Sequence, residues 1–399
     1  MKKYLARFCC ALLFSIVLFT SCSELENPVT PVNPPVTGAY IVGKAKYYTG
    51  QYYELTNYNF VYPSTDPYGH TVMLSGTITM GPEVTTDSPA RGLVLYNHYT
   101  IYKSDECPSM GKLDVQRKFQ GSGLIVVAPD YYGFGSTEGH QQAYCMARPN
   151  AQSSVDALIA ARQLLAQLGY SYGDALFNVG FSQGAQTAIG VLRLVSQSYP
   201  EIHFTRTMAG SGPYNLTETY CQLIQNDSKG MSSHAVNVLL AYNEYCSLGF
   251  SYGDLFSEPL RSHVNDWILS KTYDREEIDE RIGLQTKLSE CLSPDMSDME
   301  SAVGRRFVEA FEADNLCKGW KPRPEENILL FHSTADLTVP CSNTEQLYQF
   351  LKDQGVENVE LIEDRYGSLF GTGAHLFSAL PFIAEVQTWL CNYFGISQW

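Results

Sequence analysis

The segment that most limits how this chain can fold is the pentapeptide Gly-Phe-Ser-Gln-Gly at residues 180–184. It directly follows the apolar run at residues 175–179 and directly precedes a helix-forming stretch at residues 185–194. A strand that turns sharply at a serine into a helix holds that serine in a strained backbone conformation, and small residues two places before and after it let strand and helix pass close together. We therefore predict a nucleophile elbow with Ser182 at its tip.

Two later segments supply the partners that a nucleophilic serine needs. The apolar run at residues 327–332 is typical of a buried strand, and the polar loop after it contains Asp336. The loop at residues 367–375 ends in His375, and no other histidine follows Asp336. The interval between these two residues has room for one helix and one strand. The chain order serine, acid, histidine is one of the known orders of a catalytic triad.

Each residue type has its own chemical reason. A serine hydroxyl is a poor nucleophile at neutral pH, so a neutral imidazole must take its proton during attack, and we expect His375 to do so. A buried carboxylate fixes the tautomer of that ring, and Asp336 is the predicted acid. Asp364 is the alternative acid, and the position of Asp336 just beyond a buried strand favours Asp336.

The negative charge that develops on the substrate oxygen needs two N–H donors, one of them from the residue after the nucleophile. Gln183 supplies the first. The apolar strand at residues 92–96 runs into a polar segment from which the second donor is expected, and the backbone N–H of either Tyr99 or Thr100 is the candidate.

Three other polar residues near predicted strand ends are interpreted as structural. His98 and His332 are expected to make structural hydrogen bonds, and Asp130 is expected to brace the turn that contains Gly133 and Gly135.

These motifs together resemble the secretory lipase family of α/β-hydrolases. The resemblance covers roughly residues 46–212 and 326–394, with Tyr99 at a position where many relatives carry glycine. It implies a serine carboxylic-ester hydrolase with a helical cap. The segments that carry the resemblance are residues 66–80, 93–100, 128–136 and 180–184, with Asp336 and His375.

The N-terminus is typical of an export signal. Basic residues precede an apolar stretch at residues 8–20, which is too short to cross a bilayer as a stable helix. Residues 18–22, Leu-Phe-Thr-Ser-Cys, resemble a bacterial lipobox, so we expect a signal peptide at residues 1–21 and a lipid on Cys22. The alternative is ordinary secretion with Cys22 free. The expected location is the outer membrane or cell surface of a gram-negative bacterium, with the lipid as membrane anchor.

The proline-spaced segment after this cysteine predicts an extended tether over residues 22–38. Residues 39–399 are expected to form one α/β-hydrolase domain, because strand and helix patterns alternate along them. The alternation predicts a mostly parallel central sheet with helices on both faces. It is interrupted at about residues 213–324, where helical spacing predicts a cap insertion.

Composition excludes some functions. The formal net charge of −15 repels phosphate backbones, so nucleic acid is not an expected partner. No zinc-type spacing of cysteine and histidine and no nucleotide-binding glycine pattern is present, so neither a metal nor a cofactor is expected. Among the eleven cysteines, Cys107 and Cys145 are the first candidates for a disulfide, because both are expected in loops that flank neighbouring strands.

The leading hypothesis is a lipase or esterase that works through an acyl-Ser182 intermediate. Its substrate would be a small-molecule ester or an ester linked to a polysaccharide. A serine peptidase with the same triad is a second hypothesis. The third is a surface lipoprotein that binds glycans or lipids without catalysis.

Overall fold

The computed structural model describes residues 24–25, 38–49, 53–110, 116–119, 121–227, 232–365, 369 and 373–397. The predicted signal peptide, Cys22 and most of the predicted tether lie outside these residues. Within the part of the chain that is described, no helix is long and apolar enough to span a membrane.

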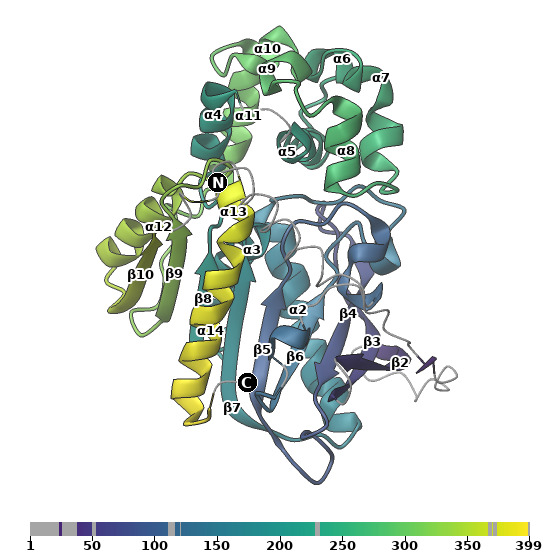
Figure 1. Ribbon diagram of the computed structural model, residues 1–399, viewed down its shortest axis with the longest axis vertical. Helices are drawn as coiled ribbons and strands as arrows, with labels where there is room; N and C mark the ends of the chain where they lie inside the picture. The colour runs from purple at the N-terminus through teal and green to yellow at the C-terminus, as the bar shows by residue number, and fades with distance from the viewer. Residues whose placement is uncertain are drawn as a thin grey trace, which may run out of the picture.

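The centre of the fold is a ten-stranded sheet with the strand order β1-β2-β3-β4-β6-β5-β7-β8-β9-β10 (Figure 1). The strands from β6 to β10 in this order are parallel to one another, and the pairs from β1 to β4, and β4 with β6, are antiparallel. The strands are β1 (Glu24–Leu25), β2 (Tyr40–Thr49), β3 (Tyr53–Thr65), β4 (Thr71–Met80), β5 (Ala90–Asn97), β6 (Leu124–Pro129), β7 (Tyr172–Phe181), β8 (Arg206–Gly210), β9 (Asn327–Ser333) and β10 (Asn358–Asp364).

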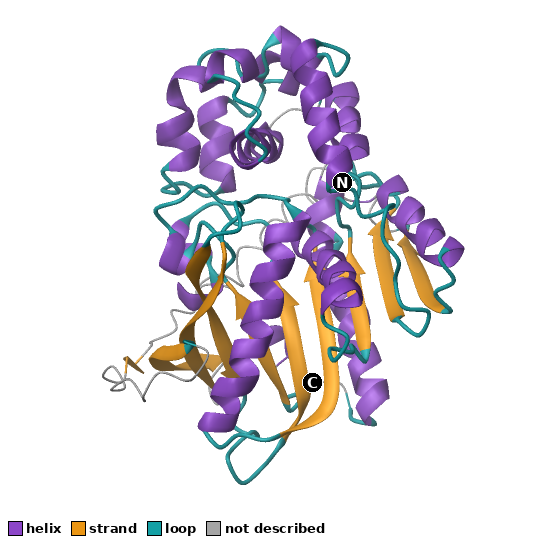
Figure 2. Ribbon diagram, turned by 180° about the vertical axis from the view of Figure 1, so that it is seen from behind, coloured by secondary structure: helices purple, strands orange, loops and turns teal. Residues whose placement is uncertain are grey.

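Helices cover both faces of the sheet and also gather at one end of it, as Figures 1 and 2 show. The α-helices are α2 (Ala147–Gln167), α3 (Gln183–Ser198), α4 (Leu216–Asn226), α5 (Ser232–Tyr245), α6 (Tyr252–Leu255), α7 (Leu260–His263), α8 (Arg275–Ile282), α9 (Leu288–Cys291), α10 (Pro294–Ser297), α11 (Ala302–Ala313), α12 (Ser342–Asp353), α13 (Ala374–Phe377) and α14 (Ala379–Phe394). The short helical turns are η1 (Ser104–Glu106), η2 (Pro108–Met110), η3 (Gln116–Phe119), η4 (Gly135–Thr137) and η5 (Val264–Leu269).

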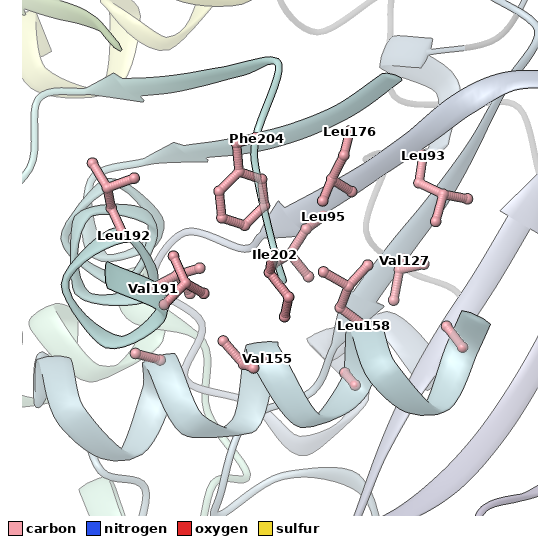
Figure 3. Packing of buried hydrophobic residues seen from close by; sticks show 14 of the residues in the cluster. Leu93, Leu95, Val127, Val155, Leu158, Leu176, Val191, Leu192, Ile202 and Phe204 are labelled. Carbon is pink, nitrogen blue, oxygen red and sulfur yellow. The ribbon is translucent and has the colours of Figure 1, made fainter. Parts of the chain in front are cut away.

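The central strands β5, β6, β8 and β9 are almost entirely buried, and successive residues point to opposite sides of the sheet. Leu93 and Leu95 of β5 pack with α2, α3 and α12 in one hydrophobic cluster, part of which Figure 3 shows. Val94 and Tyr96 of the same strand pack with α14 in another cluster. The two layers explain why the strand sequences are continuous apolar runs.

Between β8 and β9 the described residues form only helices, α4 to α11 with η5, and these lie at the end of the sheet where β7 passes into α3 (Figure 1). Their buried side chains, such as Phe256, Phe307 and Phe311, form a cluster of their own together with residues 143–146. Lys271 ties this segment to the sheet domain, because its Nζ donates to the carbonyl oxygens of Gly133, Glu138 and His140. We call residues 213–324 the cap segment below.

Several sequence expectations need correction. Strand β2 was not expected. The spacing of apolar residues predicts a helix at residues 153–168, but α2 begins earlier, at Ala147, with Pro149 in its first turn, where proline is tolerated. The apolar stretch at residues 376–393 predicts a single helix, and this prediction is wrong. Helices α13 and α14 are separate, because Pro381 near the start of α14 has no N–H to continue a helix from α13.

The expected Cys107–Cys145 disulfide is also wrong. Both thiols are free and buried. Cys107 packs in the cluster that includes α14, whereas Cys145 packs with the cap segment, so different hydrophobic clusters hold the two residues.

Candidate active site

Ser182 stands at the point where β7 ends and α3 begins, and its backbone is strained. Its φ of 56° and ψ of −121° put it outside the regions that a residue with a β-carbon ordinarily adopts. Its N–H donates to the carbonyl oxygen of Gly210 in β8 at 2.8 Å. Ala185 and Gln186 both donate their N–H to the Ser182 carbonyl oxygen, which starts the helix immediately after the turn. The predicted elbow is therefore present.

The two glycines of the pentapeptide are sterically required. A β-carbon on Gly180 would lie 2.0 Å from the carbonyl oxygen of Gly184. A β-carbon on Gly184 would lie 2.1 Å from the carbonyl oxygen of Asn97 and 2.8 Å from that of His98. Both distances are far below van der Waals contact, so only glycine allows α3 to pack this closely on the end of β5.

The structure brings the three predicted triad residues together. The Oγ of Ser182 lies 2.8 Å from Nε2 of His375. The Nδ1 of the same ring lies 2.5 Å from Oδ2 of Asp336. All three side chains are buried. His375 lies in α13 rather than at the end of a loop. Its backbone carbonyl oxygen accepts a hydrogen bond from Ser378 Oγ at 2.7 Å.

The loop after β9 holds the Asp336 carboxylate in place. Its Oδ1 accepts backbone N–H groups from Thr338 and Val339, both at 2.9 Å, which leaves Oδ2 directed to His375. Burial raises the pKa of the Asp336 carboxyl, but the positive charge of His375 and hydrogen bonds from His332 and His375 lower it more. The net pKa is well below its usual range, so Asp336 is ionised at neutral pH.

The predicted oxyanion donors belong to two segments that meet at the first turn of α3. Gln183 is the first residue of α3, where a helix leaves its N–H without an intrahelical acceptor. The chain at Asn97 and His98 touches Gly184, so the segment that continues into Tyr99 and Thr100 starts next to the first turn of α3. Thr100 Oγ1 is 3.0 Å from Tyr144 Oη, which fixes its side chain.

The two histidines interpreted as structural are buried and hydrogen-bonded. His98 has Nδ1 at 2.7 Å from the carbonyl oxygen of Tyr99, stacks on Tyr131, and burial lowers its pKa to about 4. His332 has Nδ1 at 2.5 Å from Thr344 Oγ1 and Nε2 at 2.9 Å from the carbonyl oxygen of Val339. The second contact supports the loop that carries the acid.

Asp130 also has the expected structural role. Its Oδ2 accepts a hydrogen bond from Ser75 Oγ at 2.6 Å, and Ser75 Oγ in turn accepts the N–H of Ser136 at 2.9 Å. A β-carbon on Gly135 would lie 2.3 Å from that Asp130 oxygen, so the carboxylate packs directly against the turn.

A cavity with about 450 Å³ of empty space, part of it open to solvent, reaches Ser182 from the cap segment. Its lining is mostly apolar. The lining residues are Tyr144, Cys145, Ser182, Pro213, Leu216, Thr219, Tyr220, Leu223, His234, Ala235, Val238, Thr338 and Val339. Sequence reasoning missed His234 and Tyr220, because neither stands in a motif and the fold of the cap segment is needed to place them.

The site has no companion metal centre in the part of the chain that the structure describes, since no group of three or more His, Cys, Asp or Glu side chains there is placed to hold an ion.

Solved structures with the same arrangement confirm the fold class. The rice cell wall degrading esterase LipA from Xanthomonas oryzae superposes with a TM-score of 0.74 at 20% identity, covering 86% of this chain and 92% of that one. A protein from Legionella pneumophila has a TM-score of 0.73 at 22% identity, with 86% and 89% covered. Candida antarctica lipase A in its closed state has a TM-score of 0.60 at 14% identity, with 78% and 72% covered. The fold is that of the α/β-hydrolases.

The sequence gives the narrower assignment. Residues 113–395 match the secretory lipase family, which is more than half of the chain, and the protein belongs to that family. No curated protein sequence matches the chain at a significant level. Membership makes the protein a hydrolase of the lipase and esterase kind, and the family is one of secreted proteins, in agreement with export.

Proposed function

We propose that the protein hydrolyses carboxylic esters through an acyl-Ser182 intermediate. His375 takes the proton of the Ser182 hydroxyl as its oxygen bonds to the ester carbonyl carbon. The imidazolium, held by Asp336, then gives this proton to the leaving alcohol. In the second half, His375 deprotonates a water molecule as its oxygen attacks the acyl carbon. The imidazolium then returns this proton to Ser182 Oγ as the bond from Oγ to the acyl carbon breaks and the acid is released. The backbone N–H of Gln183 and of Tyr99 or Thr100 stabilise the oxyanion in both halves.

One observation carries this proposal. Ser182 Oγ, the imidazole of His375 and the Asp336 carboxylate form an unbroken chain of contacts of 2.8 and 2.5 Å. This is the hydrogen-bond reach that proton transfer requires. A binding protein with a degenerate triad has no reason to keep a strained serine, an aligned imidazole and an ionised buried acid together, so the intact chain of contacts favours catalysis.

The cavity favours esters over peptides. A peptidase that recognises a peptide terminus needs a charged group to pair with it. The cavity that reaches Ser182 contains no aspartate, glutamate, lysine or arginine among its described lining residues, and side chains such as Leu216, Leu223 and Val238 make it apolar. Such a surface fits the hydrocarbon part of an acylglycerol, a short-chain ester or an acyl group on a polysaccharide.

A panel of substrates tests the proposal. We expect hydrolysis of p-nitrophenyl esters and much lower activity on aminoacyl-nitroanilides of matched size. Faster turnover of the nitroanilides would identify a peptidase, and no turnover of either would favour the binding protein.

We also propose that a lipid on Cys22 anchors the exported enzyme at the cell surface. The support is the lipobox-like sequence at residues 18–22 followed by a proline-rich segment. Metabolic labelling with a palmitate analogue should label the wild-type protein and leave Cys22→Ala unlabelled and released. Equal labelling of both would contradict the anchor.

A further inference from the structure

Two of the residues that line the cavity at Ser182 carry a buried polar atom without a protein partner. Both come from the cap segment: Nδ1 of His234, in the first turn of α5, and Oη of Tyr220, in α4. The rest of the lining that these helices contribute is apolar or small, for example Leu216, Leu223 and Val238. The two unpaired atoms are therefore isolated polar groups on a hydrocarbon surface.

Such atoms are costly in a folded protein. A buried donor or acceptor without a partner costs about 1–3 kcal/mol, so nearly all buried polar groups in native structures are paired. A cavity that leaves two polar atoms unpaired is consistent with a ligand that supplies the missing hydrogen bonds.

Both groups are uncharged at neutral pH, which suits a neutral ligand. Burial, then the positive charges of Arg275 and His375, lower the pKa of His234 to about 3, although Asp336 acts in the other direction. The His234 ring is thus neutral, with one N–H donor and one acceptor nitrogen. Burial first, then Cys221, raises the pKa of Tyr220 well above its usual value, so its hydroxyl remains protonated.

The ring of His234 is also positioned by its neighbours. It packs edge to face against Tyr102, with ring centroids 5.8 Å apart at an angle of 84°. His234 and Ser182 line the same cavity.

We propose, on the basis of the ester hydrolysis above, that this cavity receives the acyl half of the substrate and that His234 and Tyr220 hydrogen bond a hydroxyl group carried by that acyl chain. The substrate class is an ester of a hydroxylated, otherwise apolar acid, with either an aromatic or an aliphatic body. Residues of the sheet domain carry out the reaction, and the cap segment determines which acyl group of the substrate is preferred.

Two matched ester pairs test this assignment: ethyl 4-hydroxycinnamate against ethyl cinnamate, and ethyl 6-hydroxyhexanoate against ethyl hexanoate. The readout is the ratio of kcat/KM within each pair, which a general loss of activity leaves unchanged. We expect the wild-type enzyme to prefer the hydroxylated ester by about tenfold or more in one pair, the value of a hydrogen bond to an otherwise unpaired buried group.

The variants Tyr220→Phe and His234→Leu should each reduce that ratio severalfold or more. Tyr252→Phe is the matched control, because Tyr252 is a cap tyrosine in α6 whose Oη is paired with Asn265 at 3.1 Å outside the cavity, and it should keep the wild-type ratio. A wild-type ratio near one in both pairs, as expected if the two atoms only hold buried water, would overturn the assignment. An unchanged ratio in both variants would overturn it as well.

The outcomes that overturn the assignment of His234 and Tyr220 can be distinguished from those that overturn the proposed ester hydrolysis. An enzyme that hydrolyses p-nitrophenyl butanoate through Ser182 but shows no hydroxyl preference is an esterase without this specificity. A protein that hydrolyses none of the esters contradicts the proposed function itself.

Discussion

A β-carbon added to Gly184 would lie only 2.1 Å from the carbonyl oxygen of Asn97. The first turn of α3 and the end of β5 are therefore in direct backbone contact. This contact sets the position of the Gln183 N–H relative to the segment that contains Tyr99 and Thr100. The spacing of the proposed oxyanion donors therefore depends on residue 184 being glycine, which has no side chain.

Gly184→Ala should consequently impair both stability and activity. The added methyl group must displace backbone rather than a flexible side chain, and overpacking of this kind costs about 1–3 kcal/mol. Urea unfolding and ester turnover measure the two effects. Gly43→Ala is the control, because no atom lies within 4 Å of a β-carbon built there. Wild-type turnover in Gly184→Ala would show that this contact does not position the donors.

Asp336→Asn should reduce kcat by about 10²–10⁴-fold while the fold is kept. The amide cannot stabilise the imidazolium of His375 and favours the wrong tautomer. Asp364→Asn is the matched control, since Asp364 ends the neighbouring strand β10 while Asp336 is the carboxylate that lies 2.5 Å from His375 Nδ1. A small effect of Asp336→Asn with a large effect of Asp364→Asn would transfer the role to Asp364.

Asp336 should also make stability depend on pH in the acid range. Its pKa in the folded protein is below its usual value, which is about 3.9 in an unfolded chain. The unfolded state therefore binds the proton first, so the contribution of the carboxylate is fully present above about pH 5 and declines as pH falls below 4. The difference in free energy of unfolding between wild type and Asp336→Asn should shrink from pH 6 to pH 3. A difference that grows toward acid would contradict the lowered pKa.

Lys271→Met should loosen the attachment of the cap segment. Methionine keeps much of the side-chain length but removes the donor shared by the carbonyl oxygens of Gly133, Glu138 and His140. We expect a loss of about 2–4 kcal/mol in the free energy of unfolding, because buried polar groups lose their partner. Lys103→Met is the control, since Lys103 and Glu277 form only a surface ion pair at 3.9 Å. Equal effects of both variants would rule out a special role for Lys271.

The fold class and the triad could be predicted from the sequence, because strong local patterns mark them. A pentapeptide between a strand and a helix fixed Ser182, and the position of Asp336 after a buried strand fixed the acid. Strand β2, which lies next to the two-residue outermost strand β1, escaped prediction. Most of its described residues are only half-buried, and periodicity is weak in such a strand.

The cap segment shows the limit of this reasoning. Helical spacing there predicted helices, but not which of their residues face the serine. His234 and Tyr220 come to the same cavity only through the packing of α4 and α5 above the sheet. Long-range packing of this kind leaves no local signature, so the cap residues that line the cavity could not be predicted from the sequence.

The most direct test of the account is reaction with a fluorophosphonate probe followed by mass spectrometry of the peptides. The account predicts a single modification on Ser182, complete in the folded wild-type protein, absent in Ser182→Ala and strongly slowed in His375→Ala. Both variants should keep the wild-type circular dichroism spectrum. Folded wild-type protein that remains unlabelled at Ser182, or ester turnover that survives in Ser182→Ala, would contradict it.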